Sequence, residues 1–300
     1  GTTEEVLKPI LEESGLKCGE DFFLAFSPER VDPGNKEYNT KNTPKVVGGC
    51  TEECTEVAAA LYRNILEGDI HTVSSPAVAE MEKILENTFR NINIGLANEM
   101  AILCNRMGID VWEVIDAAKT KPYGFMPFYP GPGLGGHCIP LDPFYLEWKA
   151  KEYDYHTRLI ETSGEINDSM PEFVLDNVMK ILNKNKKALN GAKVLLLGVA
   201  YKNDIDDYRE SPAFKVIELL EKNGADLMVN DPYCPVSKYK NKTYNSVDWK
   251  EVIDESDIVI ITTNHSCYDY ESIVARAKAV YDTRNATKNV VNNREKIYKL

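Results

Sequence analysis

The segment from Ala77 to Arg106 constrains the fold most, because it contains no proline and its apolar residues recur at helical spacing. Gly95 is its only weak point for helix formation. The apolar positions extend over more of the circumference than one neighbouring layer would cover: Met81, Ile84, Leu85, Phe89, Ile92, Ile94, Leu96, Met100, Ile102 and Leu103. We therefore predict a long helix that forms the core of a homodimer or a higher homo-oligomer.

Strand-like and helix-like segments alternate on both sides of this helix. The strands are expected at 22–26, 45–49, 69–73, 193–198, 226–230, 257–262 and, as the final one, 279–281. The helices are expected up to about residue 14 and at 54–65, 111–118, 143–151, 155–182 and 212–222. Such alternation is typical of an α/β protein with parallel strands and crossover helices, so a Rossmann-like sheet is expected in the last third.

Composition excludes several classes of function. The chain has 300 residues, with 47 acidic and 35 basic side chains and a net charge of −12, so nucleic acid is not an expected partner. The longest apolar runs are far too short to cross a bilayer, and from the first residues of the sequence we expect no signal peptide. Seven cysteines without a Cys-x-x-Cys pair indicate neither a disulfide framework nor a zinc ribbon. A cytoplasmic location is expected.

The segment from Tyr129 to Asp142 is rich in glycine and carries one thiol. Gly131, Gly133 and Gly136 satisfy G-x-G-x-x-G, but prolines surround them where a dinucleotide site needs a strand before and a helix after. We interpret the segment as a tight loop that brings backbone amides to a ligand and projects Cys138 into a cleft. A small buried thiol is an equally good reading of Cys138 from this spacing alone.

Two further segments carry candidate functional residues in the first half of the chain. Lys83 and Asn87 lie on one face of the long helix, where Lys83 is either a stabiliser of a thiolate or oxyanion or a solvated surface charge. Glu29, just after an expected strand, is an acid/base residue, the ion-pair partner of Arg30 or a loop charge.

In the last third, Ser211 and Pro212 favour the start of a helix. Lys202 and Arg209 lie near that N-terminus, which could hold a phosphate or a sugar. The histidines show no metal-ligand spacing, so no metal is expected: His71, His137, His156 and His265.

Four segments in this order resemble the UDP-glucose/GDP-mannose dehydrogenase family of NAD-dependent nucleotide-sugar 6-dehydrogenases. They are Ser27-Pro-Glu-Arg30, Lys83-x3-Asn87, Gly133-Leu-Gly-Gly-His-Cys-Ile-Pro-Leu-Asp142 and Tyr201-Lys-Asn-Asp-x-Asp-Asp-x-Arg-Glu-Ser-Pro212. The resemblance implies the second half of an NAD-binding domain over 1–75, a central helical dimerisation and catalytic domain over 76–186, and a UDP-binding domain over 187–300. It also implies that the first half of the NAD-binding domain is missing, so that this chain would hardly bind NAD.

The resemblance implies two oxidations of a sugar C6 alcohol to a carboxylate, with two NAD+ per turnover. Cys138 would be the nucleophile that forms a thiohemiacetal and then a thioester. Lys83 would stabilise the alkoxide, Asn87 would hold the reacting oxygen, Asp142 would help activate water, and Glu29 would assist proton transfer. Pro33 stands where many UDP-glucose enzymes of the family have a second Glu.

The resemblance also implies the ligand contacts. The substrate-binding residues would be Tyr129, Gly133, Gly135, Gly136, Tyr201, Lys202 and Arg284, and Arg209 would reach the cofactor. The segment before Cys138 is most similar to that of members acting on UDP-N-acetylhexosamines, with UDP-N-acetylglucosamine favoured. The alternatives are UDP-N-acetylmannosamine, UDP-glucose, or a fragment that binds a UDP-sugar and dimerises without activity.

Cys138 is expected to be more reactive than the other six thiols. Cys104 lies on the buried stripe of the long helix. Cys50 and Cys54 flank a helix start with acidic neighbours, which we expect to disfavour their thiolates.

Overall fold

A computed structural model describes residues 1–32, 35 and 37–300, so Pro33 lies outside the described residues. The chain divides into two compact units, Gly1–Phe89 and Arg90–Leu300. The long helix α3 (Pro76–Met107) begins in the first unit and continues in the second. None of the described helices combines the length and apolarity that crossing a membrane requires.

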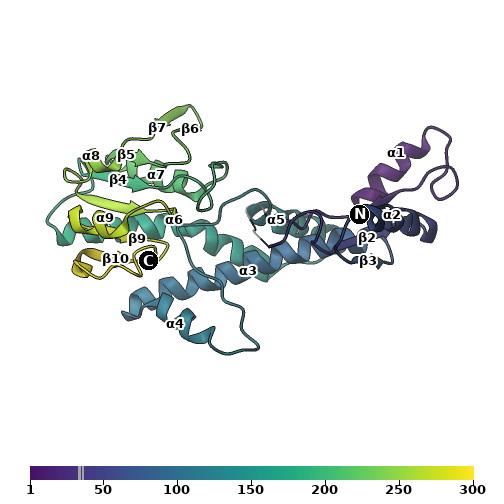
Figure 1. Ribbon diagram of the computed structural model, residues 1–300, viewed down its shortest axis with the longest axis horizontal. Coiled ribbons are helices and arrows are strands. Elements are labelled where there is room, and N and C mark those ends of the chain that lie inside the picture. Colours follow the sequence, from purple (N-terminus) through teal and green to yellow (C-terminus); the bar gives the residue numbers. More distant parts are fainter. Residues whose placement is uncertain (33–34, 36) are drawn as a thin grey trace. The chain divides into compact units, whose positions relative to one another are not determined.

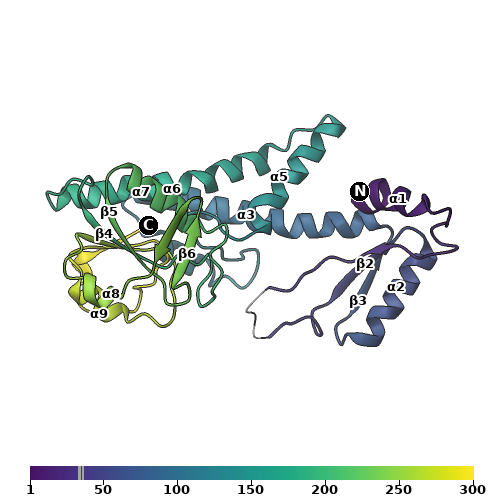
Figure 2. The ribbon, with the colours of Figure 1, turned by 90° about the horizontal axis from the view of Figure 1, so that it is seen from above.

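The N-terminal unit contains a small mixed sheet in the order β1-β2-β3. Its elements are the π-helix η1 (Thr3–Leu7), α1 (Lys8–Glu12), β1 (Ala25–Phe26), β2 (Lys45–Gly49), α2 (Glu52–Ile65) and β3 (Ile70–Val73). The parallel pair β2 and β3 is joined by α2, which packs against β2 (Figure 2). β1 is antiparallel to β2, because no helix among the described residues provides the crossover that parallel pairing needs. The expected strand at 22–26 is therefore shorter and differently paired.

The C-terminal unit opens with a helical layer. It consists of the rest of α3, α4 (Val111–Ala118), α5 (Cys138–Ala150), the 3-10 turn η2 (Lys151–Tyr153) and α6 (Arg158–Lys184). Gly95 is not the weak point that the sequence suggested. A methyl group there would overlap the Ser163 hydroxyl of α6, so the glycine allows two helix backbones to approach closely.

The same unit contains a five-stranded parallel sheet in the order β10-β9-β8-β4-β5 (Figure 1). Its elements are β4 (Lys193–Leu197), α7 (Pro212–Lys222), β5 (Asp226–Asn230), α8 (Trp249–Val252), β8 (Ile258–Ile261), α9 (Tyr270–Arg276), β9 (Val280–Asp282), the 3-10 turn η3 (Arg294–Lys296) and β10 (Ile297–Lys299). Val194 and Leu196 pack with α6 and α7 on one face, while Leu195 and Leu197 pack with α8 and α9 on the other. A sheet covered on both faces explains why β4 is apolar after Lys193, and it confirms the α/β class.

Three strands of this unit do not appear in the sequence prediction. A hairpin of β6 (Val236–Tyr239) and β7 (Lys242–Asn245) is mostly polar, and its strands of four residues are too short to show a periodic pattern. The strand predicted as final, β9, is followed by β10, which pairs parallel to it at the sheet edge. Lys299 of β10 reaches Asp110, the N-cap of α4, at 2.7 Å.

We predict that Gly95→Ala destabilises the protein by about 1–3 kcal/mol, because the added methyl group must displace α6. The sign of the change in the free energy of unfolding is informative, since a Gly→Ala change in an exposed helix stabilises a protein by about 1 kcal/mol. Chemical denaturation of Gly95→Ala, Ser163→Ala and the double variant measures the coupling. Removal of the Ser163 hydroxyl should reduce the cost of Gly95→Ala; equal costs in both backgrounds would contradict the close approach.

Candidate functional site

The glycine-rich segment ends in a helix rather than in an extended loop. Helix α5 begins at Cys138, with Pro140 in its first turn, where a proline needs no amide hydrogen. Pro143 lies inside the helix and leaves the Ile139 carbonyl without its usual donor. The Asn91 side chain of α3 donates to that carbonyl at 3.1 Å. Of the prolines that indicated a loop, Pro140 is therefore accommodated at the start of α5.

This helix start places two of the predicted catalytic residues together. Cys138 and Asp142 are four residues apart on α5 and so share one face. Cys138 is exposed, and Asp142 is half-buried. The N-terminus of a helix favours negative charge, which suits an attacking thiolate or a developing oxyanion at Cys138.

The glycines before α5 lie against residues from the sheet. A methyl group on Gly131 would come within 2.6 Å of the Arg284 guanidinium, and one on Gly135 within 2.7 Å of Pro212. Gly136, at φ +89°, has the Tyr201 ring at 3.4 Å from the position of such a methyl group. The structure thus brings the predicted residues Gly135, Gly136, Tyr201 and Arg284 together, and Gly133 also lies against Pro212.

Arg284 is a partly desolvated cation at this site. Burial lowers the pKa of its guanidinium to about 10, although the nearby Asp282 carboxylate acts in the opposite direction. Its Nε donates to the Thr262 carbonyl at 2.9 Å, and no carboxylate in the described part of the chain forms an ion pair with it. A guanidinium in this state, beside glycine backbone, is suited to receive an anionic ligand.

A buried amide network holds the glycine segment against the helical layer. The Asn98 side chain accepts from the Gly131 amide at 3.0 Å and donates to Asn167 at 2.8 Å. Asn167 donates to the Asn91 carbonyl, and Ser163 donates to the Asn91 side chain. All four side chains are buried. These residues were not predicted from the sequence. Polar residues seven apart on α3 and four apart on α6, within apolar stripes, would have indicated a buried polar contact between the two helices.

The remaining predicted binding residues of this unit have other neighbours. Arg209 is exposed and forms a two-point ion pair with Asp207, at 2.7 and 2.9 Å. Lys202 is half-buried. Tyr129 stacks on Trp112 of α4 at 5.7 Å, and its hydroxyl donates to Asp116 at 2.7 Å.

In the N-terminal unit, Glu29 is not paired with Arg30. Its carboxylate accepts from the Val31 and Arg30 amides at 2.8 Å and lies 3.5 Å from the Lys45 ammonium. The hydrogen bond from the Val31 amide is the largest influence on the pKa of Glu29 and lowers it. Burial opposes it, and the Lys45 charge and the Arg30 amide add to the lowering, so the pKa lies below its usual value. Glu29 is therefore a carboxylate at neutral pH and suits a base or a counter-ion.

The other predicted residues of this unit lie on α3. Lys83 is half-buried, so it is not the fully solvated charge that the sequence allowed, and Asn87 is buried. Arg30 forms ion pairs with Glu82 at 3.3 Å and Glu86 at 2.6 Å on the same helix.

The cysteine chemistry differs from the expectation at one position. Burial raises the pKa of the Cys50 thiol to about 12, as expected in direction. Burial also acts to raise the pKa of Cys54, but hydrogen bonds from Thr51, Leu24 and Cys18 outweigh it and lower the pKa. The acidic neighbours of Cys54 had predicted the opposite direction. Cys54 lies in the first turn of α2, where the backbone amides favour a negative charge. Among the described residues, no group of three or more His, Cys, Asp or Glu side chains could hold a metal ion.

Comparison with protein families gives three matches along the chain. Residues 77–169 match the central domain of the UDP-glucose/GDP-mannose dehydrogenase family, and residues 195–289 match its UDP binding domain. Residues 1–66 match the NAD binding domain of the same family.

Individual proteins are similar over most of the chain. Protein CapL of Staphylococcus aureus is 38% identical over 98% of this chain and 70% of its own length. The UDP-N-acetyl-D-glucosamine 6-dehydrogenase of Pseudomonas aeruginosa is 43% identical over 78% of this chain and 55% of its own length. The solved structure of the UDP-D-ManNAc dehydrogenase of Pyrococcus horikoshii superposes with a TM-score of 0.87, at 33% identity, over 100% of this chain and 69% of that one. The chain therefore spans only part of the length of each of these proteins.

We predict that Cys138 is alkylated faster than every other thiol of the folded chain near pH 7. Cys267 is the informative comparison, because it is also exposed but burial raises the pKa of its thiol and so lowers its thiolate fraction. Cys234 is buried, and burial raises its pKa to about 12. Limited alkylation followed by peptide mass mapping gives the relative rates. Labelling of Cys267 or Cys234 as fast as Cys138 would show that the start of α5 gives no advantage.

Proposed function

The chain belongs to the UDP-glucose/GDP-mannose dehydrogenase family, and we propose that it carries the UDP-sugar site and the nucleophile of a nucleotide-sugar 6-dehydrogenase. The observation that supports this most is the position of Arg284 against the glycine segment that leads into Cys138. Among the residues that the structure describes, no carboxylate forms an ion pair with this guanidinium. One end of this arrangement suits the diphosphate of a UDP-sugar. The other end presents a thiol at the start of a helix.

Cys138 is the proposed covalent catalyst. Its thiolate adds to the C6 aldehyde that the first oxidation produces, and the thiohemiacetal so formed is oxidised to a thioester. NAD+, the cofactor of the family, would supply the hydride acceptor that both oxidations require. Asp142, one turn further along α5, assists the water that hydrolyses the thioester and returns the thiol. The proposal includes three further roles. Lys83 would stabilise the alkoxide, Asn87 would hold the reacting oxygen, and Glu29 would assist proton transfer.

The described residues offer NAD+ no phosphate-binding turn of the usual kind. The Val199 and Ala200 amides that follow β4 both donate to the Asp231 carboxylate. Helix α2 follows β2 but begins with Glu52 and Glu53, whose charges repel a pyrophosphate. The five-stranded sheet is therefore proposed as the platform for the UDP-sugar, with NAD+ binding weakly to this chain.

The proposed substrate is a UDP-N-acetylhexosamine. UDP-N-acetylglucosamine is favoured, because the most identical of the relatives described above is named for that sugar. UDP-N-acetylmannosamine is the alternative, since the structural relative is named for it.

We predict that UDP-N-acetylglucosamine binds this chain and that Arg284→Gln weakens the binding by about 10- to 100-fold, because a charge-assisted contact to a phosphate is lost. Calorimetry measures both, with UDP-N-acetylmannosamine and UDP-glucose as competing ligands. Arg276→Gln is the matched control, since Arg276 pairs with Asp254 on the surface. No measurable binding of any UDP-sugar to the unaltered chain would exclude the proposal. Formation of NADH from UDP-sugar and NAD+ then distinguishes an active enzyme from a module that only binds.

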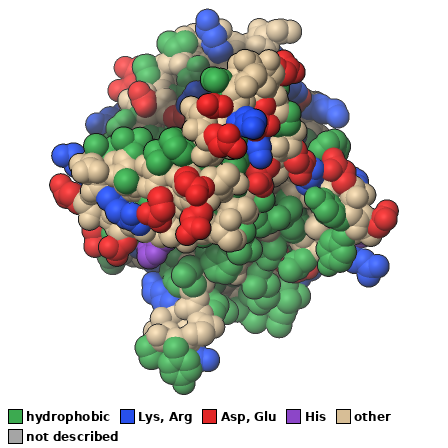
Figure 3. Space-filling view, turned by 90° about the vertical axis from the view of Figure 1, so that its right-hand side faces the viewer, with side chains coloured by type: hydrophobic (Ala, Val, Ile, Leu, Met, Phe, Trp, Pro, Cys, Tyr) green, Lys and Arg blue, Asp and Glu red, His purple; other side chains and the backbone are tan. Residues whose placement is uncertain are grey.

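The second part of the proposal is a homodimer formed through α3. Large apolar side chains remain exposed along this helix at intervals of three, four or seven residues: Val78, Met81, Leu85, Phe89, Leu96, Leu103 and Met107. Hydrophobic side chains also gather on the face of the molecule shown in Figure 3. An apolar stripe of this length is typical of a helix that packs against a partner chain.

We predict a dimeric mass in sedimentation at micromolar concentration, and a shift toward monomer when Leu96 and Leu103 are both changed to Glu. The buried charges oppose helix pairing, whereas they are hydrated in a monomer. Leu159→Glu, on an exposed leucine of α6, is the control. A monomeric mass for the unaltered chain contradicts this part of the proposal and leaves the UDP-sugar site untouched.

A further inference from the structure

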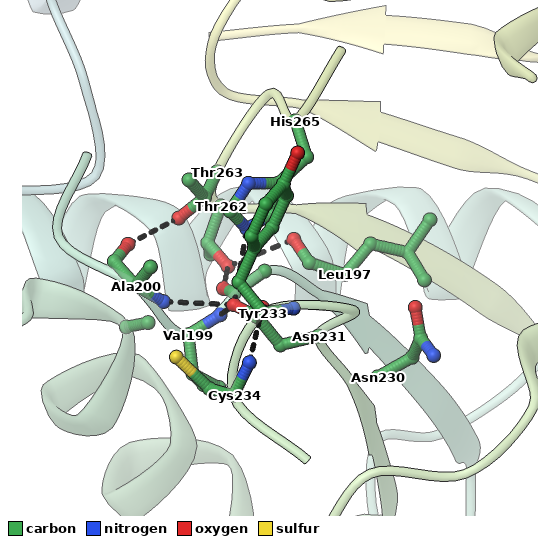
Figure 4. Close-up of polar contacts among 12 residues, drawn as sticks. Leu197, Val199, Ala200, Asn230, Asp231, Tyr233, Cys234, Thr262, Thr263 and His265 are labelled. Carbon is green, nitrogen blue, oxygen red and sulfur yellow. Dashed lines mark hydrogen bonds and ion pairs between the residues drawn. The ribbon is translucent and has the colours of Figure 1, made fainter. Parts of the chain in front are cut away.

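The C-terminal unit buries a histidine at the carboxyl ends of its central strands, where Figure 4 shows it beside Asp231. His265 follows β8, and its Nε2 lies 3.1 Å from the Asp231 carboxylate, which follows β5. Its Nδ1 accepts a hydrogen bond of 2.9 Å from the Asp204 amide. A ring nitrogen that accepts from an amide carries no proton, so Nε2 carries the hydrogen and donates it to Asp231. One neutral imidazole therefore bridges two separate segments.

Asp231 holds the first of these segments. Its Oδ2 accepts from the Val199 amide at 2.6 Å and from the Ala200 amide at 2.9 Å, just after β4 (Figure 4). Its Oδ1 accepts from the amides of Tyr233 and Cys234. Amides in the turn after a central strand are the ones that Rossmann-like sheets usually offer to a phosphate. Here an internal carboxylate occupies them, so the turn becomes a fixed support instead of a ligand site.

The second segment is held at Asp204. In addition to the bond between its amide and His265, its carboxylate accepts from the Ser266 amide at 2.8 Å and the Ser266 hydroxyl at 3.0 Å. The Ala200 carbonyl accepts from the Thr263 hydroxyl at 2.6 Å. Residues 200 and 204 are thus two fixed points, and Tyr201 and Lys202 lie between them in the sequence.

We propose that His265 is a positioning residue for substrate binding, which sets the place of Tyr201 and Lys202 by bridging Asp231 and the Asp204 amide. Tyr201 already packs against Gly135 and Gly136, so a displacement of residues 200–204 would reach the glycine segment directly. The inference rests on the proposed function, because it takes the ligand of Lys202 to be a UDP-sugar. It adds that the binding geometry depends on a side chain that need not touch the ligand.

A double-mutant cycle tests the inference on the full chain, with UDP-N-acetylglucosamine as the ligand and calorimetry as the measurement. His265→Leu removes both hydrogen bonds and should weaken binding by about 10-fold or more. In the Lys202→Ala background, His265→Leu should cause less than about half of that loss on a logarithmic scale, because its effect passes through Lys202 and Tyr201. His265→Gln keeps a donor for Asp231 and should recover part of the affinity.

Val274→Ala controls for a loss of stability, because Val274 of α9 is fully buried in the apolar core and has no hydrogen-bonding side chain. It should lower the melting temperature and leave the dissociation constant unchanged. If His265→Leu does not fold, the same cycle with His265→Gln decides. Unchanged affinity in the His265 variants, or losses that add fully to that of Lys202→Ala, would overturn the inference while Lys202→Ala alone still weakens binding. Failure of the unaltered chain to bind any UDP-sugar overturns the proposed function itself.

Discussion

The hydrogen bond from the Gly131 amide to the Asn98 side chain ties the glycine segment to the helical layer, and the site depends on it. Asn98 is fully buried, and an unpaired amide at that depth costs about 1–3 kcal/mol, so the segment has one preferred position. From that position Gly131 meets Arg284, and Gly135 meets Pro212 and Tyr201. A single buried amide on a helix thereby sets where a loop from one region meets side chains from the sheet.

The second constraint is that backbone amides and carbonyls left without a hydrogen-bond partner, beside a proline or at the end of a strand, need a partner from a side chain. Pro143 frees the Ile139 carbonyl, and Asn91 supplies the missing donor. The turn after β4 presents two amides, and Asp231 supplies the acceptor. Both solutions place a polar side chain in the core, where each is stabilising only because all its hydrogen-bonding groups are paired. They hold two chemically different features within one unit, a thiol at a helix start and the loop that we propose binds the sugar.

Most elements with a strong periodic pattern were predictable from the sequence. Four elements begin and end where the pattern predicts: the strands at 45–49 and 226–230 and the helices at 111–118 and 212–222. The start of α5 was not predictable, because prolines at 140 and 143 oppose a helix locally and the compensating donor, Asn91, lies 48 residues earlier. β10 and the β6–β7 hairpin were missed for a related reason, since their pairing comes from neighbours that are distant or polar rather than from their own apolar pattern.

The amino-acid sequence by itself determined the α/β class, the long central helix, the family and the residue types of the site. These follow from local periodicity and from short motifs, which need no knowledge of neighbours. Only the tertiary structure decided that Gly95 is a helix contact, that Arg284 lies against Gly131, and that Glu29 pairs with Lys45 rather than Arg30. It also decided the hydrogen-bond partners of His265, which lie 34 and 61 residues away along the chain. Burial and pairing are properties of groups that folding brings together, so spacing in the sequence could not supply them.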